Sequence, residues 1–437
     1  MKITMIGTGY VGLVSGACFA EFGYHVTCVD KNAEKISALK NGIIPIFEPG
    51  LDDLVMRNAE TGRLEFTGDI GKAVSEADVV FIAVGTPQGN DRRPDLTYAR
   101  AAAKEIAAHL SGYTVVVNKS TVPVGFAREV QSIIRAENPK ADFDVCSNPE
   151  FLREGSAIGD FMRPDRVVVG VENDRAAQVM KNVYRPLYLI ETPIVLTGLE
   201  TAELTKYAGN AFLATKITFI NEIANLCEKV GADVQDVAKG IGLDGRIGKK
   251  FLHAGPGYGG SCFPKDTSAL AEIGIQHGAP QQIVETVIKV NTERKFDMAA
   301  RIVAAAGGDI RGKTVGVLGL TFKPNTDDMR DSVSLSVLPT LAKAGANVRA
   351  FDPAGMNEAK KLLADCAANI SYVADAYAAA EGADVLVVLT EWNEFRALDL
   401  KRAKSMMKNP VLVDLRNIYN PVEARELGFV YMGVGRN

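Results

Sequence analysis

Short runs of apolar, mostly β-branched residues alternate along this chain with alanine-rich stretches that have helical spacing. The runs at 3–7, 25–30, 78–84, 114–118, 144–147 and 166–171 predict strands, and a second series predicts strands at 313–319, 347–352, 384–389 and 411–415. Apolar strands separated by helices are typical of mostly parallel sheets that are covered on both faces. The pattern therefore predicts an α/β protein with two doubly wound sheets, the second smaller than the first.

A long helix is predicted between the two series. Residues 201–230 are rich in Ala, Leu, Lys and Glu without an interior proline, and Gly198 and Gly231 lie just outside them. At 1.5 Å per residue this helix is ~45 Å long. One domain edge cannot cover that much apolar surface, so we expect the helix also to pack against a second copy in a homodimer.

Composition narrows the class of protein. The 437 residues favour two or three domains, and the formal net charge of −4 gives no overall attraction to nucleic acid or acidic membranes. No segment approaches the ~20 apolar residues that span a bilayer. The six cysteines lack CxxC spacing, so we expect reduced thiols in a cytoplasmic protein. The four histidines lack ligand spacing, and no metal site is expected.

The first predicted strand runs into Gly7-Thr-Gly9-Tyr-Val-Gly12, which opens a predicted helix. Gly7 permits a tight turn, Gly9 lets the backbone approach a pyrophosphate, and Gly12 allows close helix packing. Asp30 ends the next strand, where a carboxylate accepts hydrogen bonds from ribose and repels a 2′-phosphate. This context predicts a Rossmann-like site for NAD rather than NADP, a preference that the lysines just after Asp30 weaken. The alternative is a glycine turn with a solvated aspartate.

Polar residues follow further strands at the carboxyl edge of the predicted sheet, where ligands bind in such folds. Thr86 lies in Gly-Thr-Pro, which could also be an ordinary loop. Thr121, in Ser-Thr-Val-Pro-Val-Gly, could contact a cofactor, order a water or cap a helix. Glu150 and Glu154 are two carboxylates four residues apart, which could transfer protons near a reacting carbon or simply begin a helix.

One cysteine has the surroundings of a nucleophile. Cys262 lies in Gly255-Pro-Gly-Tyr-Gly-Gly-Ser-Cys262-Phe-Pro-Lys265-Asp266, among glycines that let backbone approach a ligand. Lys206 and Asn210, at i and i+4 of the long helix, share one face and can both donate to an oxyanion. The alternatives are an inert thiol and two polar residues on an exposed helix face. A dinucleotide site together with this thiol suggests oxidation through a covalent adduct.

These motifs occur in an order that resembles one known family over essentially the whole chain. They are GTGYVG, GTP, STVPVG, NPEFLREG, the Lys206/Asn210 helix, GYGGSCFPKD and GLTFKPNTDDMRDS. The chain resembles the nucleotide-sugar dehydrogenases of the UDP-glucose/GDP-mannose dehydrogenase family, and among them those that oxidise UDP-glucose at C6. The resemblance implies two Rossmann-like domains joined by a long helix.

The resemblance also implies a reaction. UDP-glucose is oxidised twice to UDP-glucuronate, a precursor for polysaccharide biosynthesis, with NAD as the acceptor and with a thiohemiacetal and a thioester on Cys262. Lys206 and Asn210 are expected to stabilise the oxyanion, Asp266 and Thr121 to hold a water, and Glu150 and Glu154 to transfer protons and promote hydrolysis. Which carboxylate is the base stays open. The alternatives are the same chemistry on GDP-mannose or a UDP-N-acetyl-hexosamine, a non-catalytic nucleotide-sugar-binding protein, and an alcohol dehydrogenase that stops at the aldehyde.

By the same resemblance, residues 1–197 form the NAD-binding domain, 198–308 a central helical domain with the cysteine loop, and 309–437 a UDP-sugar-binding domain. Arg246 is expected to reach the substrate of a neighbouring subunit. The cofactor-binding residues implied are Gly7, Gly9, Val11, Gly12, Asp30, Lys35, Thr86, Thr121, Glu154, Lys265 and Arg330. The substrate-binding residues implied are Glu150, Phe151, Leu152, Arg153, Glu154, Lys206, Asn210, Arg246, Phe251, Leu252, His253, Ala254, Gly255, Gly259 and Lys323.

Overall fold

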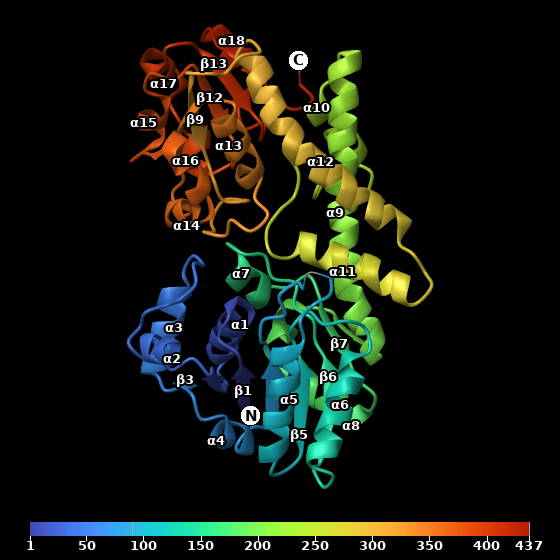
Figure 1. Cartoon of the computed structure of the whole chain (residues 1–437). Coiled ribbons are helices and arrows are strands. Elements are labelled where there is room, and N and C mark those ends of the chain that lie inside the picture. Colours follow the sequence, from blue (N-terminus) through green and yellow to red (C-terminus); the bar gives the residue numbers. More distant parts are fainter. Residues whose placement is uncertain (90, 437) are drawn as a thin grey trace. The chain divides into compact units, whose positions relative to one another are not determined.

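The computed structural model describes residues 1–89 and 91–436, which form two compact units, Met1–Gly209 and Asn210–Asn437 (Figure 1). Each unit contains one sheet. Helix α9 (Leu199–Val230) contains the boundary between the units, and the helix predicted at 201–230 is therefore confirmed, with a start two residues earlier. The predicted α/β class with two sheets and a long central helix is also confirmed. The three domain boundaries stay a prediction.

The sheet of the first unit has eight strands in the order β3-β2-β1-β4-β5-β6-β7-β8. Its described pairs are parallel except β6 and β7, which pair antiparallel. The order reverses between β1 and β4, so the carboxyl ends of these strands form a topological switch point, where ligands bind in such folds. The strands are β1 (Lys2–Ile6), β2 (His25–Val29), β3 (Leu64–Thr67), β4 (Val79–Ile82), β5 (Thr114–Asn118), β6 (Phe143–Ser147), β7 (Val167–Gly170) and β8 (Ile194–Thr197).

Apolar residues fill both faces of this sheet. Along β4, Phe81 packs in one core with Phe19, while Ile82 belongs to a second core with Ile106 and Ile134. Two buried faces explain the continuous apolar runs in the sequence. The helices of this unit are α1 (Tyr10–Glu21), α2 (Ala33–Lys40), α3 (Leu51–Glu60), α4 (Ile70–Ser75), α5 (Thr97–His109), α6 (Phe126–Glu137), α7 (Ala157–Met162), α8 (Asp174–Val183) and the 3₁₀ helix η1 (Arg185–Ile190).

The second unit contains a six-stranded sheet in the order β11-β10-β9-β12-β13-β14, and its described pairs are parallel. Its strands are β9 (Thr314–Leu318), β10 (Asn347–Phe351), β11 (Ile370–Tyr372), β12 (Val385–Val388), β13 (Val411–Asp414) and β14 (Val430–Met432). Its helices are α10 (Val234–Gly242), α11 (Phe263–Gln276), α12 (Gln282–Ala305), α13 (Ser334–Lys343), α14 (Met356–Leu362), η2 (Ala364–Asn369), α15 (Ala376–Ala380), α16 (Asn393–Arg396), α17 (Leu400–Met406) and α18 (Pro421–Glu426). Among the described residues, no helix combines the length and the apolar character needed to cross a membrane.

The two sheets share one local device, an aspartate at the end of the second strand. In the first unit, Asp30 accepts hydrogen bonds from the backbone N–H and the hydroxyl of Thr8, in the turn after β1. In the second unit, Asp352 accepts them from the backbone N–H groups of Leu320 and Thr321, in the turn after β9. Asp352 is fully buried, whereas the Asp30 side chain keeps 19% of its surface exposed.

Candidate active site

The glycine turn after β1 has the geometry of an anion-binding turn. Gly7 has a φ of 100°, and a Cβ on Gly12 would lie 2.0 Å from the Gly7 carbonyl oxygen, so both positions require glycine. Gly9 begins helix α1 without a side-chain cap, and a Cβ there would have no heavy atom within 4 Å. The first N–H groups of α1 are therefore accessible to a pyrophosphate, as a bound dinucleotide requires.

The charge of Asp30 is stabilised by its neighbours. Burial alone would raise the pKa of this carboxyl, but hydrogen bonds from Thr8 and Asn32 and the Lys35 ammonium 3.3 Å away hold it below its ordinary value. Asp30 is therefore ionised at neutral pH, which suits a ribose acceptor. The other lysine, Lys31, forms an ion pair with Glu105 instead.

A buried ion pair lies at the carboxyl edge of the first sheet. The Lys206 ammonium lies 3.0 Å from a Glu150 oxygen, and the two side chains are only 4% and 6% exposed. Burial would raise the pKa of Glu150, but Lys206, the N–H of Leu152 and the more distant Lys119 outweigh it and hold the pKa below its ordinary value. The Lys206 ammonium also lies 5.5 Å from the centre of the Phe151 ring. Lys206 is thus held in place by a carboxylate.

Other predicted residues of the first unit converge on this edge. The Thr86 hydroxyl donates to the carbonyl of Thr121, which joins the loops after β4 and β5. Glu203 of α9, which was not predicted for the site, accepts hydrogen bonds from the N–H groups of Gly125 and Ala127 at the start of α6. A small cavity between these loops is lined by Asn118, Ser120, Thr121, Val122, Ser147, Pro149, Glu203 and Lys206. The structure therefore brings Thr86, Thr121 and Lys206 to one edge of the sheet.

The loop that contains Glu154 is hydrogen-bonded to the glycine turn through Glu48, a residue that the sequence analysis missed. The buried Glu48 carboxylate accepts hydrogen bonds from the N–H groups of Gly155 and Ala157, at 2.6 and 2.7 Å, and from the hydroxyl of Tyr10. Tyr10 lies within the glycine motif, and Glu154 immediately precedes Gly155. Glu48 therefore fixes the acidic loop against the start of α1.

Cys262 lies in the second unit, immediately before helix α11, and it is partly exposed. Cys262 therefore lies at the N-terminus of a helix, where negative charge that develops on a bound group is stabilised. The hydroxyl of Ser261 lies 3.4 Å from the sulfur. The aromatic ring of Phe263 packs near Phe251 and Tyr258, at centroid distances of 6.1 and 5.9 Å. The other cysteine in this unit that is partly exposed is Cys366.

Two residues that were predicted for the site in different roles, Asn210 and Asp266, meet within the second unit. The Asn210 amide donates to Asp266 Oδ2 at 2.6 Å, and both side chains are buried. Lys265 lies 3.1 Å from the other oxygen of Asp266. Asp266 thus accepts a hydrogen bond on Oδ2 and forms an ion pair through Oδ1. It lies in the first turn of α11, one turn after Cys262.

The two glycines at positions 259 and 260, shortly before Cys262, pack closely against another segment of the same unit. A Cβ on Gly259 would lie 2.4 Å from the carbonyl oxygen of Asp331, and one on Gly260 would lie 2.6 Å from the ring of Phe322. The Gly260 N–H donates to the carbonyl of Arg330 at 2.8 Å. Gly259 and Gly260 are therefore required by packing against the segment 322–331 of the same unit. The predicted contact of this loop with a ligand stays a prediction.

Two long helices clamp the beginning of the cysteine loop. Asn221 of α9 accepts from the Gly255 N–H, while Arg294 of α12 donates to the Gly255 carbonyl. Asn291 of α12 bonds both the N–H and the carbonyl of Tyr258. The sequence analysis missed these buried polar residues. Their only signal is that polar side chains interrupt the apolar face of a helix.

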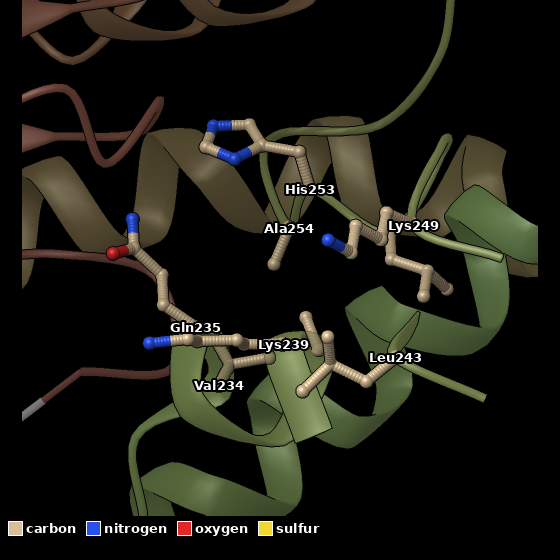
Figure 2. A pocket seen from close by; sticks show the side chains of 9 residues that line it. Val234, Gln235, Lys239, Leu243, Lys249, His253 and Ala254 are labelled. Atoms are coloured by element: carbon tan, nitrogen blue, oxygen red, sulfur yellow. The ribbon is translucent and has the colours of Figure 1, made fainter. Parts of the chain in front are cut away.

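A cavity of about 320 Å³ lies beside the loop predicted to cover the substrate. Figure 2 shows Gln235, Lys239 and Leu243 on one side and Lys249, His253 and Ala254 on the other. The ring of His253 lies 2.7 Å from the carbonyl oxygen of Arg416, which ties this loop to the segment after β13. Three of the predicted substrate-binding residues, Leu252, His253 and Ala254, thus line one cavity.

Three stretches of the chain match three domains of one protein family. Residues 1–188 match its NAD binding domain, residues 200–293 its central domain, and residues 316–421 its UDP binding domain. The chain belongs to the UDP-glucose/GDP-mannose dehydrogenase family. The resemblance inferred from the motifs is therefore confirmed, and with it NAD as the cofactor and an oxidoreductase as the class of enzyme.

Individual members of the UDP-glucose/GDP-mannose dehydrogenase family are similar over the full length. The chain is 64% identical to a UDP-glucose 6-dehydrogenase of Rhizobium meliloti, over the whole of both chains. It is 50% identical to the UDP-glucose 6-dehydrogenase TuaD of Bacillus subtilis, over all of this chain and 93% of TuaD. The solved structure of a UDP-glucose dehydrogenase from Pyrobaculum islandicum has 39% identity and a TM-score of 0.91, and the match covers 100% of this chain and 98% of that one.

Some positions that the family resemblance implies are exposed. Arg153 forms an ion pair with Asp160 of α7, while Arg246 and Arg330 each form one with the aspartate two residues before them. The Arg246 side chain is 90% exposed. Lys323 lies 5.1 Å from the ring centre of Phe322. Phe251 has a φ of 65°, so the substrate loop contains a left-handed turn at a bulky residue. The ligand contacts of all these residues stay predictions.

Proposed function

We propose that the chain oxidises UDP-glucose to UDP-glucuronate in two NAD-dependent steps at one site, with Cys262 as the covalent nucleophile. The observation that carries the proposal is the position of Cys262 before α11, followed one turn later by the Asn210–Asp266 pair. Full-length identity of 64% to a UDP-glucose 6-dehydrogenase supports the choice of substrate within the family.

The side chains have complementary tasks in this scheme. The residues of the glycine turn and Asp30 would hold NAD, which would supply the hydride acceptor for both oxidations and give two molecules of NADH per sugar. After the first oxidation, the Cys262 thiolate adds to the aldehyde carbon to give a thiohemiacetal. Donors such as Lys206 and Asn210 stabilise its oxyanion, and collapse with loss of the second hydride leaves a thioester. Water then cleaves the C–S bond, which releases the carboxylate and restores the thiol.

The carboxylates serve the proton transfers and the hydrolysis. Glu150 is held ionised and paired with Lys206, so the two groups can exchange a proton as charge develops on the substrate oxygen. Asp266 and Thr121 are assigned to a water near the reacting carbon. Glu154, which is half-buried in the loop fixed by Glu48, is assigned to hydrolysis of the thioester.

A panel of nucleotide sugars tests the proposal. UDP-glucose, GDP-mannose and UDP-N-acetyl-hexosamines are each incubated with NAD, and the NADH formed per sugar consumed is measured. We expect a ratio near two with UDP-glucose and little turnover of the others. A ratio near one would indicate release of the aldehyde, and turnover of another sugar in preference to UDP-glucose would contradict the assigned substrate.

We also propose that the enzyme is a cytoplasmic homodimer that supplies UDP-glucuronate for polysaccharide biosynthesis. Phe212, Phe219 and Leu226 lie seven residues apart on α9 and are 65%, 50% and 55% exposed. Residues at this spacing share one face of a helix, so α9 has an apolar stripe that a second copy can bury. Among the described residues no cysteine pair forms a disulfide, which suits a reducing compartment.

A further inference from the structure

A buried lysine with no role in the proposed reaction lies next to the Glu150–Lys206 pair. Lys119 follows β5 directly and is only 3% exposed. Its ammonium donates to the side-chain oxygen of Asn148 at 3.1 Å and to the hydroxyl of Tyr184 at 3.4 Å. It also lies 5.9 and 5.8 Å from the ring centres of Phe81 and Phe161. An ammonium in an apolar core is costly unless a nearby charge stabilises it.

The hydrogen bonds of Lys119 fix the segment that carries Glu150. Asn148 begins the sequence Asn148-Pro149-Glu150, and its backbone N–H and both polar atoms of its side chain form hydrogen bonds. Its backbone N–H donates to the carbonyl of Asn118 at 2.9 Å, and its amide donates to the carbonyl of Val168 at 2.8 Å. Its amide oxygen accepts from both Lys119 and the hydroxyl of Tyr184. The backbone that leads into Glu150 is therefore anchored to β5, β7 and the end of α8.

Several titratable groups surround Glu150 and Lys119. Lys206 of α9 pairs directly with Glu150, and Glu203 lies one turn before it on the same helix. Burial raises the pKa values of Cys146 on β6 and of Tyr184, so both are neutral over the working range of pH. Burial lowers the pKa of Lys119 to about 8, with Glu150 opposing that decrease. Lys119 and Lys206 are thus the positive charges that act on Glu150.

We propose that Lys119 is a positioning residue for the dehydrogenase reaction, which holds the Asn148-Pro149-Glu150 segment and supplies a second buried positive charge that keeps Glu150 ionised beside Lys206. This inference rests on the proposed function. Lys119 donates hydrogen bonds to Asn148 and Tyr184, so its effect on the reaction passes through the position and the protonation of Glu150. If Lys119 were neutral, Lys206 would be the only one of these two lysines to offset the free-energy cost of burying the charged Glu150 carboxylate.

Three variants separate charge from packing. Lys119→Met removes the charge and the hydrogen bonds, whereas Lys119→Gln removes the charge and keeps a donor. Tyr184→Phe is the matched control, because it removes a hydrogen bond to the same Asn148 oxygen without any change of charge. The rate of NADH formation from UDP-glucose is measured from pH 9 down to the lowest pH, below 4.5, at which the wild type stays folded, together with the thermal midpoint at pH 7.5.

For both Lys119 variants we expect the pH at which kcat/KM falls on the acid side, the acid limb, to rise by about one pH unit. At a pH below this limb, kcat/KM is then about tenfold lower than in the wild type. We expect Tyr184→Phe to leave the limb in place. An unchanged limb in a folded Lys119→Gln protein would overturn the inference, as would an equal shift in Tyr184→Phe. If Lys119→Met does not fold, Lys119→Gln decides. A wild-type protein that oxidises no nucleotide sugar would instead overturn the proposed function, and that result appears before any variant is made.

Discussion

At the scale of single residues, the sulfur of Cys262 is the atom that, in the proposed scheme, distinguishes acid formation from simple alcohol oxidation. We expect Cys262→Ser to lower UDP-glucuronate formation by about 10³-fold, because a hydroxyl without a dedicated base is a poor nucleophile. Binding of UDP-glucose, measured by calorimetry, is expected to stay within about threefold of the wild type. Cys366→Ser is the matched control, since Cys366 is also partly exposed in the second unit and bonds a carbonyl. Wild-type turnover in Cys262→Ser would exclude the covalent scheme.

The Glu150–Lys206 pair makes a prediction about stability. Removal of one partner from a buried pair strands the other charge, so we expect Glu150→Gln to lower the free energy of unfolding by about 3–5 kcal/mol at pH 7. The folded pKa of Glu150 lies below its ordinary value of 4.5, so its stabilisation is complete above that value and is lost as pH falls through the folded pKa. Urea unfolding at pH 7 and pH 4 measures both effects.

An exposed pair provides the comparison. Glu129 pairs with Arg100 on the surface of the first unit, where solvent screens the charges, so Glu129→Gln is expected to change stability little at either pH. A loss of stability in Glu150→Gln that persists undiminished at pH 4 would mean that packing, and not the charge of Glu150, is responsible.

At the scale of elements, the loop of residues 255–262 needs glycine at 259 and 260, because larger residues there would collide with neighbouring atoms. Gly259→Ala would place a methyl group 2.4 Å from the carbonyl oxygen of Asp331, which must displace the loop before Cys262. We expect kcat to fall at least about tenfold, because small displacements of a nucleophile are costly. Gly245→Ala is the control, since a Cβ there has no heavy atom within 4 Å. Equal activity in both alanine variants would contradict a fixed loop, and steady-state kinetics decide.

The elements also show what the sequence could predict. The central strands and helix α9 were predicted because long apolar runs and helical periodicity are local signals. The edge strands β3, β8, β11 and β14 were not predicted, because they are short and their exposed positions break the apolar run. Motif order predicted residues that the structure brings together, such as Asn210 with Asp266 and Thr86 with Thr121. Glu48 and Lys119 were missed, because only the fold reveals that a polar residue is buried and which groups it binds.

At the scale of the whole molecule, the apolar stripe on α9 predicts an oligomer. We expect the wild type to sediment as a dimer and Phe219→Asp to sediment as a monomer, because a buried carboxylate without a partner opposes association. Val422→Asp is the control, since Val422 is similarly exposed, at 58%, but lies on α18. Analytical ultracentrifugation measures both variants, and a dimeric Phe219→Asp protein would exclude this face as the interface.

The two aspartates at the ends of second strands, Asp30 and Asp352, show that the same sequence position can have different surroundings in the two units. Asp352 receives four hydrogen bonds on one oxygen, from Leu320, from both donors of Thr321 and from Trp392, and two on the other, from Ala354 and Gly355. Both oxygens of Asp352 thus accept hydrogen bonds from within the protein, whereas the side chain of Asp30 is partly exposed to solvent. A sequence pattern that takes an acidic residue at the end of a second strand as a cofactor-binding residue would select both Asp30 and Asp352. Asp352 has a structural role in the second unit, whereas Asp30, the predicted ribose acceptor of the first unit, keeps accessible surface.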